Sequence, residues 1–212
     1  PTGDKAGGPP GPAAPAAPRL RSYFPETLYV NPLVLTDANG LARIDIDMAD
    51  SITTWRLSAL ASDRDGRLGS TSAGLKVFQD FFVDIAFPAS LTRHDQVTVP
   101  VAVYNYLPAP QTVELTFAAD GGLAVQGATT ASVKLGPHEV KGVQVPLVAQ
   151  RVGQGRLTVT ARGTKLADAV RREVRIEPDG FPLATTASGL AADPIELNVE
   201  VPEGAIEAAT TA

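Results

Sequence analysis

The only two imidazole side chains, His94 and His138, are the first candidates for acid–base chemistry or metal binding. Both lie between residues typical of turns, in Arg93-His94-Asp95 and Pro137-His138-Glu139. No Gly-x-Ser-x-Gly sequence offers a serine nucleophile, and the chain contains no cysteine. Two isolated histidines without cysteines make a poor zinc site. We therefore expect two exposed loop histidines, no enzymatic activity, no metal and no cofactor.

Two acidic segments have a weak similarity to calcium-binding loops: Asp37-Ala38-Asn39-Gly40 and Asp63-Arg64-Asp65-Gly66. Both lack the further acidic ligands and the bidentate glutamate that an EF-hand loop requires. Tight turns explain both segments more simply, because Asn and Gly tolerate positive φ angles. The sequence therefore predicts turns at these positions.

Three basic residues, Lys5, Arg19 and Arg21, lie within or beside a head rich in proline, glycine and alanine that covers residues 1–21. Such a composition buries too little apolar surface to offset its ordering entropy, so the head is predicted to be a mobile linker. Trypsin-like proteases cleave after Lys and Arg, which makes these three residues candidate cleavage sites. An ordinary interdomain linker has the same composition.

The composition excludes several classes of partner. A chain of 212 residues with 44% hydrophobic residues is large enough for one or two domains with real cores. Its net charge of −5 provides no basic surface for nucleic acid or an anionic membrane. It has no run of 18 apolar residues, so direct membrane insertion is not expected. The chain begins at Pro1, and we expect it to be a piece of a larger protein.

From Tyr23 onward, strand-like runs alternate with turn signals, which favours an all-β fold. The turn at Asp37–Gly40 is flanked by 33–35 and 41–48, and we expect these two runs to form a hairpin. Ile44, Ile46 and Met48 alternate with aspartates, which predicts one buried face and one wet face. Trp55–Ala61 is the next predicted strand.

The stretch 80–177 is predicted to be a sandwich of the immunoglobulin or fibronectin type III kind, because it contains seven short strand-like runs and almost no helical periodicity. Pro100 interrupts the alternating valines of the second run, which predicts an edge position or a bulge. The seven predicted strands are Phe81–Phe87, Gln96–Tyr104, Thr112–Ala118, Ala131–Leu135, Lys141–Val148, Gly155–Ala161 and Asp168–Ile176.

Several strings, in a fixed order and spacing, are similar to those of the alpha-2-macroglobulin and complement family. Their amino-acid sequences resemble the bacterial alpha-2-macroglobulin-like branch more than animal complement. The residues that carry this resemblance are Phe24, Pro25, Glu26, Asp50, Ser51, Ile52, Thr53, Thr54, Trp55, Phe78, Phe81, Phe82, Tyr104, Asn105 and Tyr106. The aromatic residues among them are expected to pack within and between modules rather than to form a binding patch.

The resemblance implies an all-β fold of macroglobulin-type β-sandwich modules and a division of the chain into four parts. Residues 1–21 would be the downstream end of a bait region, and 22–79 would be the C-terminal part of a bait-bearing macroglobulin module. Residues 80–178 would form a complete macroglobulin module, and 179–212 would begin a CUB-like domain that includes a final strand, Ile195–Pro202. The half-module 22–79 is expected to be less stable than 80–178, because a sandwich with missing strands exposes unpaired edges.

The resemblance also implies a function: a non-catalytic segment of a broad-spectrum endopeptidase inhibitor that traps proteases after bait cleavage. Its partners would be target proteases, acting through the parent protein, and the adjacent thioester and macroglobulin domains. The chain has no cysteine, so the thioester itself cannot lie within it. A periplasmic or extracellular location is expected, with any membrane anchor in another part of the parent. The alternative is a β-sandwich spacer or adhesion module of an exported surface protein.

Overall fold

The computed structural model describes residues 18–184, 186, 201, 203–206 and 209. These residues form strands, turns and irregular segments, and the expected all-β fold is confirmed. Within the described ranges there is no helix of the length and apolarity needed to cross a membrane. Lys5 and, apart from Val201, the predicted strand Ile195–Pro202 lie outside the described residues.

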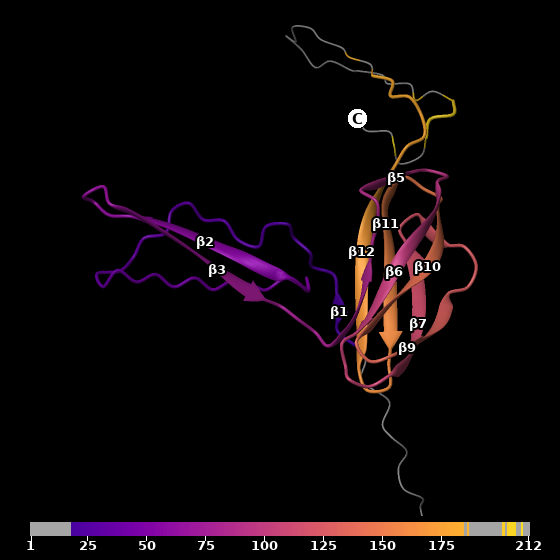
Figure 1. Cartoon of the computed structure of the whole chain (residues 1–212). Helices are drawn as coiled ribbons and strands as arrows, with labels where there is room; N and C mark the ends of the chain where they lie inside the picture. Colours follow the sequence, from indigo (N-terminus) through magenta and orange to yellow (C-terminus); the bar gives the residue numbers. More distant parts are fainter. Residues whose placement is uncertain (1–17, 185, 187–200, 202, 207–208, 210–212) are drawn as a thin grey trace, which may run out of the picture.

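Most of the described chain forms a sandwich of two sheets (Figure 1). The first sheet contains, in spatial order, β1 (Leu20–Arg21), β12 (Ala167–Glu177), β11 (Gly153–Arg162), β7 (Gln111–Asp120) and β9 (Thr130–Leu135), with β5 (Ser90–Thr92) paired parallel to β12. The second sheet contains, in spatial order, β4 (Phe81–Ile85), β6 (Gln96–Asn105), β10 (Glu139–Ala149) and β8 (Leu123–Val125).

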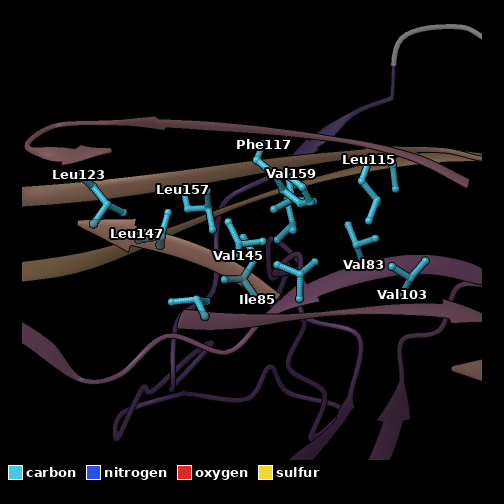
Figure 2. Close-up of a cluster of buried hydrophobic side chains, with 14 of the residues drawn as sticks. Val83, Ile85, Val103, Leu115, Phe117, Leu123, Val145, Leu147, Leu157 and Val159 are labelled. Carbon is cyan, nitrogen blue, oxygen red and sulfur yellow. The ribbon is translucent and has the colours of Figure 1, made fainter. Parts of the chain in front are cut away.

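The core lies between the two sheets and is built by strict alternation of side chains. In β7, Val113, Leu115 and Phe117 are buried while the residues between them are exposed. In β6, Val99, Val101 and Val103 are buried, as the alternating valines predict. Figure 2 shows how valine and leucine side chains from the two sheets meet in this layer. The period of two residues in each strand therefore separates a dry face from a wet one.

All seven strands predicted for 80–177 are present, with boundaries that agree to within two residues. Two further strands, β5 and β8, were not predicted. Each contains only three residues, and each is defined by its pairing with a distant strand, β5 with β12 and β8 with β10. Such short segments carry too little periodicity to be recognised from the sequence.

Pro100 lies in β6, which is an inner strand of its sheet, so it is not on an edge strand, but it stands where the neighbouring strand β4 has ended. The neighbour β4 ends at Ile85, which pairs with Val101. Immediately beyond that end, the Pro100 carbonyl accepts a hydrogen bond from the Ala86 N–H (3.2 Å). Proline is tolerated there because the ladder with β4 stops at the preceding pair, where a missing N–H costs little.

A separate two-stranded ribbon, β2 (Thr54–Ser62) and β3 (Leu68–Lys76), extends away from the sandwich (Figure 1). Its register places Trp55 opposite Leu75 and Leu57 opposite Ala73, so these four side chains share one face. Except for Trp55, which is half-buried, every residue of the ribbon is exposed. The ribbon therefore presents an apolar face that no other described strand covers.

The predicted hairpin around Asp37–Gly40 is only partly correct. The turn forms, with Gly40 at a φ of 75° and its N–H bonded to the Asp37 carbonyl (3.0 Å). The runs 33–35 and 41–48 are not strands, and Ile44 and Met48 are 43% and 40% exposed rather than buried. A strand requires a neighbour for its backbone groups, and none of the described strands pairs with these runs.

Candidate functional site: the anchor of the linker

The end of the proline-rich head is part of the sandwich. Leu20 and Arg21 form β1, which pairs parallel to β12 in register with Ala169 and Val170. The predicted linker 1–21 therefore stops earlier than expected, because its last two residues occupy a position at the edge of the first sheet. Figure 1 places β1 beside the lower end of the sandwich, where the chain continues toward the ribbon.

Arg21 is held by a buried ion pair with Asp168. Its Nε donates to Asp168 Oδ1 (3.0 Å) and its Nη2 donates to Asp168 Oδ2 (2.7 Å). The two residues are only 5% and 4% exposed. This bidentate geometry matches the planar guanidinium to both carboxylate oxygens, which makes the contact specific for arginine.

The same pair satisfies the backbone of β4, an edge strand of the second sheet. The Val83 N–H donates to Asp168 Oδ2 (2.9 Å), and the Val83 carbonyl accepts from Arg21 Nη2 (2.5 Å). A buried strand edge with unpaired N–H and C=O groups would be costly. Arg21 and Asp168 thus take the place of a neighbouring strand and connect the two sheets on one side of the sandwich.

Asp50 holds the next residues of the chain. Its Oδ2 accepts from the N–H groups of Ser22 and Tyr23 (2.9 Å each), and its Oδ1 accepts from Arg19 Nη2 (2.6 Å). Its own N–H donates to the Tyr23 carbonyl (2.8 Å), and its carbonyl accepts from Arg21 Nη1 (3.3 Å). Asp50 therefore bonds to four of the five residues between positions 19 and 23.

The charge state of Asp50 follows from these contacts. Burial raises the pKa of Asp50, but the backbone N–H groups of Tyr23 and Ser22 and the charges of Arg19 and Arg21 lower it. The net effect is a pKa below the ordinary value of 3.8, so the carboxylate stays ionised at neutral pH.

Phe24 completes the anchor through its contact with Arg172 of β12. The guanidinium carbon of Arg172 lies 3.6 Å from the centre of the Phe24 ring, and Arg172 Nη2 donates to Asp84 Oδ1 (3.0 Å). Phe24 also packs against the core of the sandwich. A cation above an aromatic face, fixed by a carboxylate, adds an attractive contact that holds the chain after β1.

An aromatic cluster lies where the ribbon leaves the sandwich. Phe82 stacks on Tyr104 with ring centres 4.3 Å apart, and Tyr106 is 5.2 Å from Phe78. Together with residues 52–54 and 76–77, these rings line an open recess of about 320 Å³. Phe82 is buried, whereas Phe78 is 47% exposed, so the cluster forms the corner of the junction rather than a closed core.

The other resemblance residues have varied environments. Asn105 is fully buried and donates to the carbonyls of Ala109 and Gly136, which fixes two turns of the sandwich. Phe81 belongs to the core. Trp55 is only half-buried, and its Nε1 is enclosed without a hydrogen-bond partner. The remaining residues are half-buried (Pro25, Ser51 and Ile52) or exposed (Glu26, Thr53 and Thr54).

Two of the predicted cleavage sites, Arg19 and Arg21, differ in how far their side chains are exposed. Arg19 has a side chain that is 80% exposed, although its guanidinium binds Asp50. Arg21 is buried in the ion pair with Asp168, so its prediction as an accessible cleavage site is wrong for the folded chain. The sequence could not distinguish the two, because the partner that buries Arg21 lies 147 positions away.

Both histidines lie in turns, with positive φ angles of 74° for His94 and 53° for His138. His94 Nδ1 lies 3.2 Å from Asp179 Oδ2, and its side chain is 68% exposed. Among the residues that the structure describes, no group of three or more His, Cys, Asp and Glu side chains could hold a metal ion. The acidic segment 63–66 forms the turn of the ribbon, where the Gly66 N–H donates to the Asp63 carbonyl (3.2 Å).

Two residues of the anchor, Asp168 and Arg172, were not recognised in the sequence. Asp168 lies between Ala167 and Ala169, and an acidic residue within an apolar strand could have indicated a buried partner. Arg172 offers a similar signal, because it alternates with the buried residues Val170 and Val174.

The fold and the order of motifs have counterparts among known proteins. A sequence model of the Alpha-2-macroglobulin family matches residues 27–117. Complement C3 of Eptatretus burgeri is 28% identical over 170 residues, which are 76% of this chain and 10% of that protein.

Two solved structures share the fold. The crystal structure of trypsin-activated alpha-2-macroglobulin from Escherichia coli matches 74% of this chain and 12% of its own, with a TM-score of 0.59 and 20% identity. The crystal structure of Salmonella alpha-2-macroglobulin reacted with methylamine matches 68% of this chain and 10% of its own, with a TM-score of 0.51 and 22% identity.

The chain thus spans about a tenth of the length of these relatives. The family match covers Asp50, the ribbon and the first strands of the sandwich, but neither Arg21 nor Asp168. Sequence and fold both make this chain similar to proteins of the alpha-2-macroglobulin family.

Proposed function

We propose that this chain is a non-catalytic framework segment of a bacterial alpha-2-macroglobulin-like inhibitor of endopeptidases. A target protease would cleave the bait region, the modules would rearrange, and the protease would be trapped. The chain would contribute the downstream end of the bait, its anchor, and the module that follows it. Such a role is mechanical: cutting a restraining linker releases a conformational change.

One observation carries this proposal: the end of the proline-rich head is fixed into the sandwich by the ion pair of Arg21 and Asp168. A buried ion pair at the end of the proline-rich head can transmit a cut in that head to a folded module. The Escherichia coli relative is described as trypsin-activated, which supports a protease-triggered change in this family.

We also propose that 22–79 is the C-terminal part of a bait-bearing module and that 80–178 is a complete macroglobulin module. The exposed apolar face of the ribbon supports the first assignment. Leu57 and Leu75, on that face, are 42% and 43% exposed, as expected where partner strands are supplied from elsewhere. Residues 179–212 would begin a CUB-like domain.

The partners would be target proteases and, within the parent, the adjacent macroglobulin and thioester domains. The location would be periplasmic or extracellular, since an inhibitor of this kind meets its targets outside the cytoplasm. The absence of cysteine from this chain requires that any thioester be supplied by another part of the parent.

The test uses the intact parent protein and a broad-specificity protease. Mass spectrometry should find the first cut upstream of Arg19, and small-angle scattering should show a more compact particle after it. A parent whose residues before Arg19 are replaced by an uncleavable Gly-Ser linker of equal length is the control, and its shape should not change. A cut in this region without a change of shape would contradict the proposal and leave a spacer module.

A further inference from the structure

Arg19 presents a conflict between exposure and contact. Its side chain is 80% exposed, which by itself makes it the best cleavage site for a trypsin-like protease in this segment. Its guanidinium nevertheless binds Asp50 Oδ1 at 2.6 Å, and the next residue, Leu20, is paired to β12. A protease needs the arginine side chain in its own pocket and the flanking backbone free, so both contacts must open before cleavage.

We infer that Asp50 and the Arg21–Asp168 pair form a clamp that ends the protease-sensitive part of the chain at residue 18. The clamp protects the bonds after Arg19 and Arg21, so cleavage upstream leaves the stub 19–24 attached to the sandwich. The inference requires no protease trapping; it depends only on contacts within residues 19–24, Asp50, Val83 and Asp168.

The clamp consists of two parts that protect different bonds. Cleavage after Arg19 requires release of the Arg19–Asp50 pair and of the first residue of β1. Cleavage after Arg21 requires, in addition, release of the buried pair with Asp168 and of the hydrogen bonds from Ser22 and Tyr23 to Asp50. Protection should therefore be stronger at Arg21 than at Arg19.

The connection between the two parts is Asp50 itself. Its carbonyl accepts from Arg21 Nη1 while its carboxylate holds the backbone of Ser22 and Tyr23. Asp50 lies four residues before the ribbon strand β2, so the clamp also fixes the start of the ribbon to the sandwich. A cut before residue 19 would therefore leave this connection intact.

The experiment measures trypsin cleavage of the full 212-residue chain, with each product identified by mass. The reference is a synthetic peptide with the sequence of residues 14–26, which contains the same two bonds without the fold. In the native chain both bonds should be cut at least about 100-fold more slowly than in the peptide, because only an opened minority is cleaved. Equal rates in chain and peptide would overturn the inference.

Variants test whether Asp50 is the cause. Asp50→Asn should raise the rate of cleavage after Arg19 by about tenfold, because the charge-assisted hydrogen bonds are weakened. Asp45→Asn is the matched control: it removes an exposed carboxylate from the same loop and should leave this rate unchanged. Slow cleavage after Arg19 in Asp50→Asn would assign the protection to β1 pairing alone and contradict the role of Asp50.

A general loss of structure is recognised by faster cleavage within the sandwich, for example after Arg162 in β11. If Asp50→Asn shows this faster cleavage within the sandwich, Asp50→Glu is used in its place. The glutamate keeps the charge, but its side chain is too long to bond the same N–H groups and Arg19 together. Selective cleavage after Arg19 in Asp50→Glu supports the clamp, and unchanged protection contradicts it. If the bond after Arg19 is protected but the parent protein does not change shape after cleavage, the proposed function is refuted and the inference of the clamp stands.

Discussion

At the scale of single residues, two aspartates hold the same short segment by different physical means. Asp168 is buried with Arg21 and completes the edge of β4, so its contribution depends on a dry, bidentate contact. Asp50 instead receives two backbone N–H groups and an exposed arginine, in the manner of a cap. Removal of one member of a buried ion pair is costly because the other charge is left unpaired.

Asp168→Asn tests the buried pair. We expect a loss of about 3 to 5 kcal/mol in the free energy of unfolding of the sandwich, because Arg21 keeps its charge without a matching partner. Urea denaturation followed by circular dichroism measures this loss. Asp45→Asn, whose carboxylate is 83% exposed, should change stability by less than about 0.5 kcal/mol. A similar, small effect of both substitutions would show that the Arg21–Asp168 pair stabilises little.

The lowered pKa of Asp50 predicts a dependence of stability on pH. In the unfolded chain the group titrates near 3.8, and in the folded chain it titrates lower. Its stabilising contribution is therefore complete above the unfolded value and is lost as the pH falls through the folded pKa. Urea denaturation between pH 7 and pH 2 should show this loss in the wild type.

Asp50→Asn should make the acid limb of that profile shallower, while Asp45→Asn should leave it unchanged. Part of the slope should persist in Asp50→Asn, because the pKa of Asp179 is also lowered: burial raises it, but its own backbone N–H and the Arg93 guanidinium outweigh that effect. An acid limb of identical slope in the wild type and Asp50→Asn would show that folding does not lower the pKa of Asp50.

At the scale of elements, the ribbon and the sandwich differ in what supports them. Strands β6, β10 and β11 have neighbours on both sides and bury an alternate face in the core. The ribbon strands β2 and β3 pair only with each other and contribute no residue to that core. An isolated two-stranded ribbon is marginally stable in water, because it buries little apolar surface.

Hydrogen exchange should make this difference visible. We expect the amides of β2 and β3 to exchange at least about 100-fold faster than those of β6 and β11, because the ribbon opens without opening the sandwich. Mass-resolved exchange of the full chain provides the comparison, with β12 as an internal reference beside the clamp. Equal protection of ribbon and sandwich would show that the apolar face of the ribbon is covered in solution.

At the scale of the whole molecule, the folded sandwich begins earlier in the chain than the strands predicted from the sequence indicate. The seven predicted strands start at Phe81, yet the sandwich also requires β1, which lies 60 positions earlier in the chain. Between them the chain leaves to form the ribbon and returns. The two sheets of the sandwich are built from β4–β12 together with β1, so we expect the stability of the sandwich to depend on a contact between distant parts of the sequence.

Two truncated chains test this dependence. A chain beginning at Asp80 and ending at Pro178 should be less stable, by about 3 kcal/mol, than one that begins at Pro18 and ends at the same residue, because Asp168 loses its partner. Asp168→Asn in the shorter chain should recover part of the loss, since the neutral amide can still accept from the Val83 N–H. Equal stability of the two chains, measured by urea denaturation, would show that the sandwich does not need β1.

The sequence alone determined the strands of the sandwich, since side chains alternating with a period of two must divide between a dry and a wet face whatever their partners are. It also determined the family resemblance at positions such as Asp50 and Asn105, and the turns at 37–40 and 63–66, because turn chemistry is local.

Only the tertiary structure decided what pairs with what. Burial of Arg21 depends on Asp168, pairing of β5 depends on β12, and the predicted strands 33–35 and 41–48 do not form because no described strand lies beside them. These outcomes depend on contacts between residues far apart in the chain, which no local pattern encodes. For the same reason, a basic residue that the sequence indicated as a cleavage site, Arg21, is the residue that the fold buries most deeply at the end of the linker.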